Sequence, residues 1–500
     1  MLSVKKSLNC RQSGILLPIS ALPSPWGIGT LGKAAYAFAD FLAQSGQRFW
    51  QVLPVGPISY GDSPYQSFSS YAGNPYLIDL DLLAMDGLLL PQEYQPLSWG
   101  DDPCRIDYAQ LFNQRFVVLQ KAYDRGWERD REAVAVFIRE QAGWLPDYAL
   151  FMALKRHFSF VPYTEWPIEI RLRRPDAVAA YRQKLAKDIH FFIYLQFLFF
   201  RQWDMLRAYV HQNGIQLIGD LPIYAAGDSA DTWADPEIFW LDADCRPVRV
   251  AGCPPDAFSE NGQLWGNPVY RWDVLKERGY DWWLRRVAAA GKRYDILRLD
   301  HFRGFESFYA IPAGDTTAKN GVWLPGPGIE LFRLIRKQEP NLQIIAEDLG
   351  FLTPGVRRLL RQTGYPGMKV LLFGLYPDSD SSYLPHHIDP KSVAYIGTHD
   401  NDTVLGWIQQ APLENVCFAR AYMHLTQEEG YHWGMIRTLL STRANTVILQ
   451  MQDLLGLDNT ARMNLPSTVG GNWVWRMPAD ACTQSLAEHL YQMTRLYGRI

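Results

Sequence analysis

Tyr294-Asp-Ile-Leu-Arg-Leu-Asp-His-Phe-Arg-Gly304 is the stretch from which the organisation of this chain can be worked out. Residues 296–299 predict a short buried strand, because the run is too brief for a helix and ends abruptly in charge. Side chains alternate along a strand, so Arg298 and Asp300 point to the same side. The strand therefore presents a guanidinium beside a carboxylate at its C-terminal end.

Two interpretations of this pair are open. A nearby positive charge lowers the pKa of a carboxyl group and keeps it ionised, which a carboxylate nucleophile requires. The same pattern also arises as a structural ion pair at the end of a strand, where it perturbs pKa values without any function. The rest of the chain decides between them.

Further strand–helix units surround this stretch. Other segments with the composition of buried strands are 14–20, 49–55, 214–220, 342–347, 368–373 and 392–397. Helical segments are expected at 33–44, 282–290, 329–338 and 354–363. Repeated strand–loop–helix units build a parallel sheet covered by helices. With about eight such strands, we expect an α/β fold in which a (β/α)8 barrel of the TIM type is favoured over an open doubly wound sheet.

Two insertions are expected in a single barrel domain that spans residues 1–500 and has no separate C-terminal β domain. Residues 108–124, 131–158 and 175–212 show 3.6-residue apolar periodicity. We therefore expect a largely helical insertion at about 85–170, with the last helix returning the chain to the barrel. A loop-rich insertion is expected at about 221–275.

Composition limits the partners and the compartment. The formal net charge is −3 with no long run of either sign, which argues against nucleic acid or an anionic membrane as a partner. Residues 1–14 lack the apolar segment of a signal peptide, and the apolar run 191–200 is too short to span a bilayer. The six cysteines are scattered without a C-x-x-C pair, which is typical of reduced cytosolic thiols. We expect a cytoplasmic protein; no feature predicts its oligomeric state.

One motif suggests a different class of protein. Gly27-Ile-Gly-Thr-Leu-Gly32 matches the G-x-G-x-x-G pattern of dinucleotide-binding sites. However, Pro18, Pro23 and Pro25 separate these glycines from the preceding strand, and the next strand runs into Gly56-Pro57 without a ribose-binding acid. A glycine-rich connection into a helix is the better interpretation, and a nicotinamide-dependent oxidoreductase is kept as an alternative. No cofactor is expected.

Acidic residues follow four of the predicted strands: Asp220, Asp300, Glu347 and Asp400. The C-terminal ends of barrel strands meet at one mouth, where like charges cost stability unless something uses them. Clustered carboxylates suit Mg²⁺ or Ca²⁺. Alternatively, one carboxylate attacks a sugar while a second, kept protonated, donates to the leaving oxygen. The long aromatic loop 60–76 favours the second use, because sugars need flat apolar platforms.

Longer motifs carry a resemblance to a known family. They are Gly56-Pro-Ile-Ser-Tyr-Gly-Asp-Ser-Pro-Tyr-Gln-Ser-Phe-Ser69, Ala72-Gly-Asn-Pro-Tyr76, Gly219-Asp-Leu-Pro-Ile-Tyr224, Asp228-Ser-Ala-Asp-Thr-Trp-Ala234, Pro254-Pro-Asp-Ala-Phe-Ser-Glu-Asn-Gly-Gln-Leu-Trp-Gly-Asn-Pro268, Arg298-Leu-Asp-His-Phe-Arg-Gly304, Ala346-Glu-Asp-Leu-Gly350, Tyr365-Pro-Gly-Met-Lys369 and Gly397-Thr-His-Asp-Asn-Asp-Thr403. In this order, and over most of its length, the chain resembles the 4-alpha-glucanotransferases of the amylomaltase (disproportionating enzyme) family, relatives of the α-amylases.

The resemblance implies roles for individual residues. Asp300 would be the nucleophile that forms a covalent glucosyl-enzyme, Glu347 the general acid and then the base, and Asp400 a stabiliser of the transition state through sugar hydroxyls. Arg298 would keep Asp300 ionised and oriented, and residues 254–268 would form a flexible active-site loop. The implied substrate-binding residues are Tyr60, Asp62, Ser63, Tyr65, Asp220, Trp265, Arg298, His399 and Asn464. For the aromatic members of this set, simple core packing is the alternative.

The implied reaction is retaining transfer of α-1,4-glucan segments between maltooligosaccharides, or to glucose, without metal or cofactor. Such a double displacement requires the two reacting carboxyl groups to lie about 5–5.5 Å apart. A loop that covers the site would favour transfer by excluding water. Two alternatives remain: an α-1,4-glucan hydrolase that uses the same acids, and a non-catalytic glucan-binding protein, against which the intact set of acids argues.

Overall fold

The computed structural model describes residues 8–59, 61–255, 260–350 and 352–500. Eight parallel strands close into a barrel in the order β1-β12-β11-β10-β9-β6-β3-β2. They are β1 (Gln12–Leu16), β2 (Phe49–Gln51), β3 (Gln216–Leu221), β6 (Ile296–Leu299), β9 (Gln343–Ala346), β10 (Gly367–Val370), β11 (Ser392–Tyr395) and β12 (Thr446–Gln450). The (β/α)8 barrel expected from the sequence is confirmed.

One barrel strand, β12, was not among the predicted ones. It is fully buried and closes the barrel by pairing with β1 and β11. Its apolar residues continue into a short helix, α17 (Met451–Leu454), without an intervening glycine or proline. Such a run carries no local signal that separates a strand from a buried helix.

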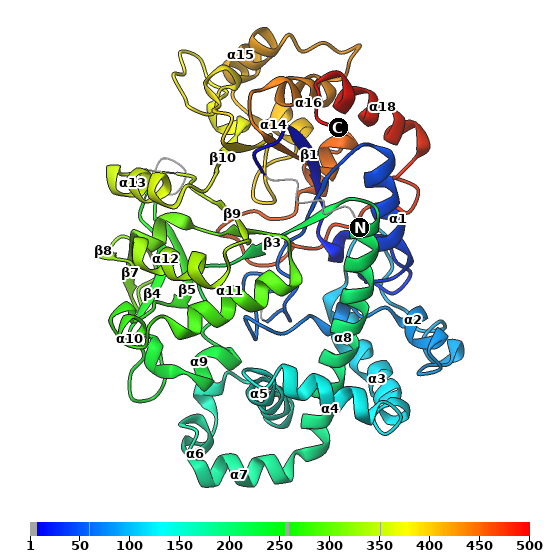
Figure 1. Ribbon diagram of the computed structural model, residues 1–500, viewed down its shortest axis with the longest axis vertical. Helices are drawn as coiled ribbons and strands as arrows, with labels where there is room; N and C mark the ends of the chain where they lie inside the picture. Colours follow the sequence, from blue (N-terminus) through cyan, green and yellow to red (C-terminus); the bar gives the residue numbers. More distant parts are fainter. Residues whose placement is uncertain (1–7, 60, 256–259, 351) are drawn as a thin grey trace.

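Helices cover the outside of the barrel (Figure 1). They are α1 (Lys33–Gln44), α11 (Asp281–Arg293), α12 (Ile329–Gln338), α13 (Pro354–Thr363), α14 (Val404–Gln410), α15 (Leu413–Met423), α16 (Tyr431–Ser441) and α18 (Gln484–Leu496). The helix α1 begins directly after the glycine-rich turn. A Cβ atom on Gly32 would lie 2.0 Å from a carboxylate oxygen of Asp79. Because a carboxylate at this turn repels phosphate, the turn is the structural connection that we expected.

The helical region between β2 and β3 lies at one end of the molecule, at the bottom of Figure 1. It comprises α2 (Leu80–Met85), α3 (Tyr108–Gly126), α4 (Arg131–Glu140), α5 (Leu145–His157), α6 (Ile168–Arg171), α7 (Pro175–Lys184) and α8 (Ala186–Gln212). The predicted helix 131–158 is divided into α4 and α5, and the predicted helix 175–212 into α7 and α8. In the described part of the chain, no helix combines the length and apolar character that a membrane crossing requires.

Two glutamines of α8 attach the long aromatic loop to the scaffold. The side-chain amide of Gln196 accepts from the N–H of Gly73 at 2.7 Å and donates to its carbonyl at 2.9 Å. Gln202 contacts the backbone of Asp79 in the same way, at 2.7 and 3.1 Å. This pairing explains why a polar residue interrupts the apolar run 191–200, since buried backbone groups need hydrogen-bond partners.

A second sheet, not predicted from the sequence, lies beside the barrel at the left of Figure 1. Its antiparallel order is β5-β4-β7-β8, formed by β4 (Arg249–Cys253), β5 (Gln263–Pro268), β7 (Ser307–Pro312) and β8 (Val322–Pro325). Two short helices, α9 (Ala230–Ala234) and α10 (Trp272–Glu277), complete the region 221–275. The strand β5 contains Gly266 with a φ of 79°. A strand with such an interruption lacks the alternating pattern that predicts strands.

Candidate active site

Strand register brings the acidic residues of neighbouring strands together. Asp220 of β3 lies opposite Arg298 of β6, and Leu299 of β6 lies opposite Ala346 of β9. Asp300 and Glu347 therefore follow their strands at matched positions, on neighbours separated by about 4.8 Å. Their backbone N–H groups continue the pairing by donating to the carbonyls of Leu221 and Leu299 at 3.1 and 3.0 Å, respectively.

The guanidinium of Arg298 is shared between two carboxylates. Its Nη1 donates to Asp300 at 3.0 Å, so the side-by-side placement predicted from strand alternation is confirmed. The same nitrogen lies 2.8 and 2.7 Å from the two carboxylate oxygens of Asp220. The side chains of Arg298 and Asp220 are 5% and 0% exposed. A buried cation, rather than open space for a metal ion, lies between these two acids.

Asp300 and Glu347 have different pKa values. Burial raises the pKa of Asp300 to about 6, against the lowering effect of Arg298, and Asp220 raises it further. The expectation that Arg298 keeps this pKa low is therefore correct only for its own contribution, which burial outweighs. Burial likewise raises the pKa of Glu347 to about 8, with Asp300 adding to the shift and Arg298 opposing it. Near neutral pH, Asp300 is ionised while Glu347 is protonated.

Backbone N–H groups orient Glu347. The N–H of His301 donates to Oε2 at 2.7 Å and the N–H of Leu349 donates to Oε1 at 3.0 Å. His301 adopts a left-handed conformation with a φ of 47°, which costs about 1–2 kcal/mol for a residue other than glycine. Its imidazole is buried, which lowers its pKa to about 3. Sequence reasoning missed this role, because it depends on the backbone conformation.

Asp400 follows β11 and is held by two neighbours. The side-chain amide of Asn464 donates to Oδ1 at 2.6 Å, and Nε2 of His399 lies 3.4 Å from Oδ2. Burial alone would raise the pKa of Asp400, but His399 and Asn464 together hold it at about 2. The carboxylate is therefore ionised, and its side chain is still 44% exposed.

Aromatic rings lie beside Asp220 and Asp400. The hydroxyl of Tyr65 donates to Asp220 at 2.8 Å, and its ring stacks on His399 with centroids 5.2 Å apart. Trp473 lies 5.8 Å from both rings. Trp473 was not predicted; its sequence signal is limited to a Trp-Val-Trp run shortly after a glycine pair, in a loop without periodicity.

Trp265 of β5 lies beside His301, the residue that follows Asp300. Its indole contacts the imidazole of His301 edge-on, with centroids 4.8 Å apart, and donates to the side chain of Gln263 at 3.0 Å. Gln66 donates to Asn267 at 2.8 Å and so joins the long aromatic loop to β5. The aromatic residues expected at 65 and 265 therefore flank the acids from two different segments.

Asp62 and Ser63 lie in the turn before Tyr65. The hydroxyl of Ser63 accepts from the N–H of Tyr65 at 3.3 Å, which shapes this turn. Asp62 has a φ of 58°, and burial raises its pKa. Among the described residues, neither side chain hydrogen-bonds to one of the three acids. Tyr60 lies outside the described residues.

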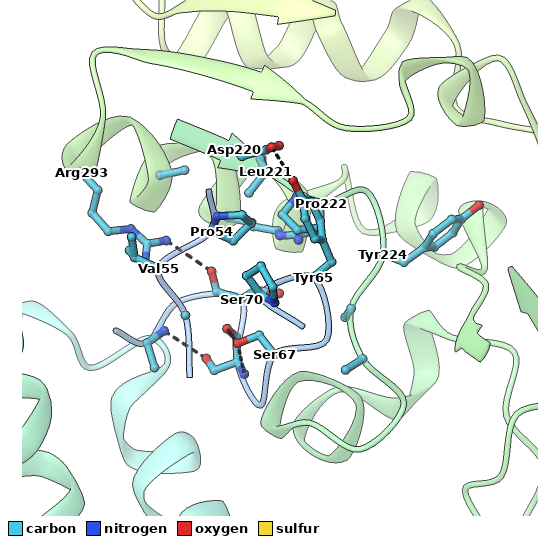
Figure 2. A pocket seen from close by; sticks show the side chains of 18 of the residues that line it. Pro54, Val55, Tyr65, Ser67, Ser70, Asp220, Leu221, Pro222, Tyr224 and Arg293 are labelled. Carbon is cyan, nitrogen blue, oxygen red and sulfur yellow. Dashed lines mark hydrogen bonds between the residues drawn. The ribbon is translucent and has the colours of Figure 1, made fainter. Parts of the chain in front are cut away.

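A cavity of about 40 Å³ separates the aromatic loop from α11. Figure 2 shows Tyr65 and Asp220 joined on one side and Arg293 reaching towards Ser70 on the other. Arg293 donates to the carbonyls of Tyr71 and Ser70 at 3.0 and 3.3 Å. Because a water needs about 10–15 Å³ of such space, the cavity has room for a few waters rather than a sugar. We regard it as part of the support of the loop.

Known proteins resemble this chain over nearly its whole length. A family model described as 4-alpha-glucanotransferase matches residues 17–482. The 4-alpha-glucanotransferase of Clostridium butyricum is 48% identical over 483 residues, which are 96% of this chain and 99% of that protein. The 4-alpha-glucanotransferase of Streptococcus pneumoniae is 46% identical over 496 residues, 98% of each chain.

Solved structures agree with these relatives. The amylomaltase of Streptococcus agalactiae, solved in complex with acarbose, has a TM-score of 0.96 and 44% identity, covering 98% of this chain and 99% of that one. The amylomaltase of Corynebacterium glutamicum has a TM-score of 0.79 at 18% identity, covering 100% of this chain and 77% of that one, and so shares the fold.

Proposed function

Because the chain belongs to the 4-alpha-glucanotransferase family, we propose that it moves α-1,4-glucan segments between maltooligosaccharides, or from them to glucose. The observation that carries the mechanism is the placement of Asp300 and Glu347 at matched ends of neighbouring strands, where burial raises the pKa of Glu347 above that of Asp300. A retaining transfer needs one carboxylate and one carboxylic acid at such positions.

In the first step, the ionised carboxylate of Asp300 attacks the anomeric carbon of the donor glucan. Glu347 gives its proton to the glycosidic oxygen, the bond between this oxygen and the anomeric carbon breaks, and the shortened glucan leaves. A covalent glucosyl-Asp300 remains. The two backbone N–H groups that hold Glu347 keep its carboxyl group in one orientation for this transfer.

In the second step, Glu347 is a carboxylate and acts as the base. It takes the proton of an acceptor hydroxyl, whose oxygen attacks the anomeric carbon and releases Asp300 in its ionised form. The two inversions give net retention. Arg298, buried between Asp220 and Asp300, is proposed to orient Asp300 in both steps.

Asp400 and His399 are proposed to bind hydroxyl groups of the donor sugar, since Asp400 is ionised and partly exposed. Hydrogen bonds of this kind strengthen as the ring approaches the transition state. Asp220 is proposed to act through Arg298 and Tyr65, and Asn464 through Asp400. Substrate-binding roles for Tyr60, Asp62 and Ser63 rest on the family motif in which they lie.

Transfer rather than hydrolysis requires that an acceptor sugar displace water from the covalent intermediate. The aromatic side chains of Tyr65 and Trp473 lie against His399, and that of Trp265 lies against His301. Such rings offer platforms for sugars. A hydrolase would use the same acids, but no observation favours it over transfer.

Incubation with maltotriose, with and without added glucose, tests the proposal. We expect a ladder of longer maltooligosaccharides together with glucose, and we expect added glucose to shorten the ladder by acting as an acceptor. Glucose and maltose without longer products would establish a hydrolase. The variant Asp300→Asn is expected to abolish both products, and unchanged activity of this variant would rule out the mechanism.

The proposal also includes the domain organisation and the compartment. We propose a single catalytic domain, residues 1–500, with a helical insertion at about 85–170 and a second insertion at about 221–275 that includes the active-site loop. A cytoplasmic location is supported by the six scattered cysteines, which form no C-x-x-C pair in the sequence.

A further inference from the structure

Arg462 lies behind Asp400 and contacts three different groups. Its Nη2 donates to the backbone carbonyl of Asp400 at 2.6 Å, and its Nε donates to the carbonyl of Asn464 at 2.8 Å. Its Nη1 bonds to the carboxylate of Asp402. The side chains of Arg462 and Asp402 are 18% and 24% exposed. The planar guanidinium thus holds the segment of Asp400 and Asp402 and the segment of Asn464 at fixed angles to each other.

Asn464 completes the connection to the carboxylate of Asp400. Its backbone N–H donates to the carbonyl of His399 at 3.1 Å, and its side chain donates to Oδ1 of Asp400 at 2.6 Å. Arg462 therefore fixes the backbone of Asp400 directly, and fixes its side chain through Asn464. We call Arg462, Asp402 and Asn464 the Arg462 clasp.

Two further residues anchor the segment that carries Asp402. Asn459 donates to the carboxylate of Asp402 at 2.9 Å and accepts from the N–H of Thr403 at 3.1 Å. Asp453, in the short helix α17 after β12, accepts from the N–H of Val404 at 2.8 Å. The loop after β11 is thus held by the segment after β12, its neighbour in the barrel.

We propose that Arg462 is a positioning residue of the transfer reaction, which holds the Asp400 carboxylate in the orientation that the transition state requires. Burial does not supply this orientation, because the Asp400 side chain is 44% exposed. The inference rests on the proposed function, in which Asp400 binds donor hydroxyls. It adds a residue that acts through Asp400 and its neighbour Asn464.

The Arg462 clasp acts by holding the Asp400 carboxylate in position, so its effect has to be measured in a quantity that depends on that position. Loss of Arg462 frees Asn464, and the pKa of Asp400, held at about 2, then rises. Asp300 must be ionised for activity and has a pKa of about 6. The acid limb of the pH–rate profile therefore reports Asp300 in both enzymes. The informative result is whether kcat falls while KM stays nearly the same.

Arg462→Met is the test, with Arg437→Met as its matched control. Arg437 lies on α16 and also binds one carboxylate, that of Glu429, at 2.6 and 2.9 Å. It contacts the carbonyls of Met423 and His424 as well, and its side chain is 30% exposed. The two variants therefore lose similar contacts, and only the first touches the support of Asp400.

With maltotriose as substrate, Arg462→Met should lower kcat by about 100-fold, because displacement of a catalytic group by about 1 Å has this effect. KM should change by less than about threefold, because the hydrogen bonds of Asp400 to the donor sugar strengthen mainly in the transition state, and loss of such an interaction lowers kcat and kcat/KM together. Arg462→Lys keeps the charge but reaches fewer acceptors, and its kcat should lie between those of Arg462→Met and the unmodified enzyme. Arg437→Met should keep the unmodified kcat.

An Arg462→Met enzyme with the kcat of Arg437→Met would overturn the inference. If Arg462→Met does not fold, Arg462→Lys and Asp402→Asn answer the same question, and an unchanged kcat in both would also overturn it. Asp400→Asn separates this result from failure of the proposed function. If Asp400→Asn loses activity while the Arg462 variants keep it, the clasp is rejected and the role of Asp400 stands. Full activity in Asp400→Asn would reject the role of Asp400, and a lack of longer products from the unmodified enzyme would reject the function.

Discussion

Glu347→Gln is predicted to remove activity and, at the same time, to change how stability depends on pH. In the folded protein, burial raises the pKa of Glu347 from its usual value of 4.5 to about 8. Between these values the folded state binds the proton and the unfolded state does not. Stability therefore falls as pH rises through this interval. The stabilising contribution is complete below about pH 4.5 and is lost as the pH passes 8.

The size of the effect follows from the same two values. Between pH 5 and pH 8, this difference in proton binding lowers the free energy of unfolding by about 3 kcal/mol. This is an upper figure, because the Glu347 side chain is partly exposed. Glutamine cannot titrate, so Glu347→Gln lacks this pH dependence. It also places an amide NH₂ against one of the two backbone donors, which costs about 1–3 kcal/mol at every pH.

Urea unfolding of both proteins at pH 5, 6, 7 and 8 measures the difference. We expect the free energy of unfolding of the unmodified enzyme, relative to that of Glu347→Gln, to fall by about 3 kcal/mol across this range. Glu414→Gln, at an exposed position of α15, controls for removal of a carboxylate. A difference that stays constant with pH would refute the raised pKa, and with it the charge assignment of the two acids.

Three other substitutions test the support of the site. Arg298→Gln removes a positive charge whose interaction with Asp300 is worth about 4 kcal/mol. The acid limb of the pH–rate profile, set by Asp300 near pH 6, should therefore move up by about 2–3 pH units, and an unmoved limb would contradict the role of Arg298. Tyr65→Phe loses the 2.8 Å hydrogen bond to Asp220 and should lower kcat/KM for maltotriose about tenfold. An unchanged value would mean that Tyr65 contributes only by packing against its neighbours. Gln196→Leu leaves a buried N–H and C=O unpaired and should lower the free energy of unfolding by about 2–4 kcal/mol, measured in urea; a smaller loss would show that the loop finds other partners.

Local patterns predicted a large part of the fold. Short apolar runs identified seven of the barrel strands, because a strand buried on both faces needs little more than length and apolarity to be recognised. The strand β12 and the sheet β5-β4-β7-β8 were missed. Their segments lack boundary signals or alternation, and the pairing that stabilises them comes from residues far away in the chain.

The candidate site likewise contains residues that the sequence predicted and contacts that it did not. The positions of Asp300, Glu347 and Asp400 follow from strand ends and motifs, but their partners do not. Asp220 shares the guanidinium of Arg298 because β3 and β6 pair in one particular register. The backbone N–H of His301 reaches Glu347 only because this residue adopts a left-handed conformation.

The sequence by itself determined which acids this protein has and that strand alternation sets Arg298 beside Asp300. The tertiary structure decided which acid is charged. An adjacent arginine suggested a low pKa for Asp300, yet burial raises it to about 6, and it raises that of Glu347 further, to about 8. The penalty for burying a charge depends on everything that surrounds the carboxyl group. Those surroundings come from several strands and loops that meet only when the barrel closes.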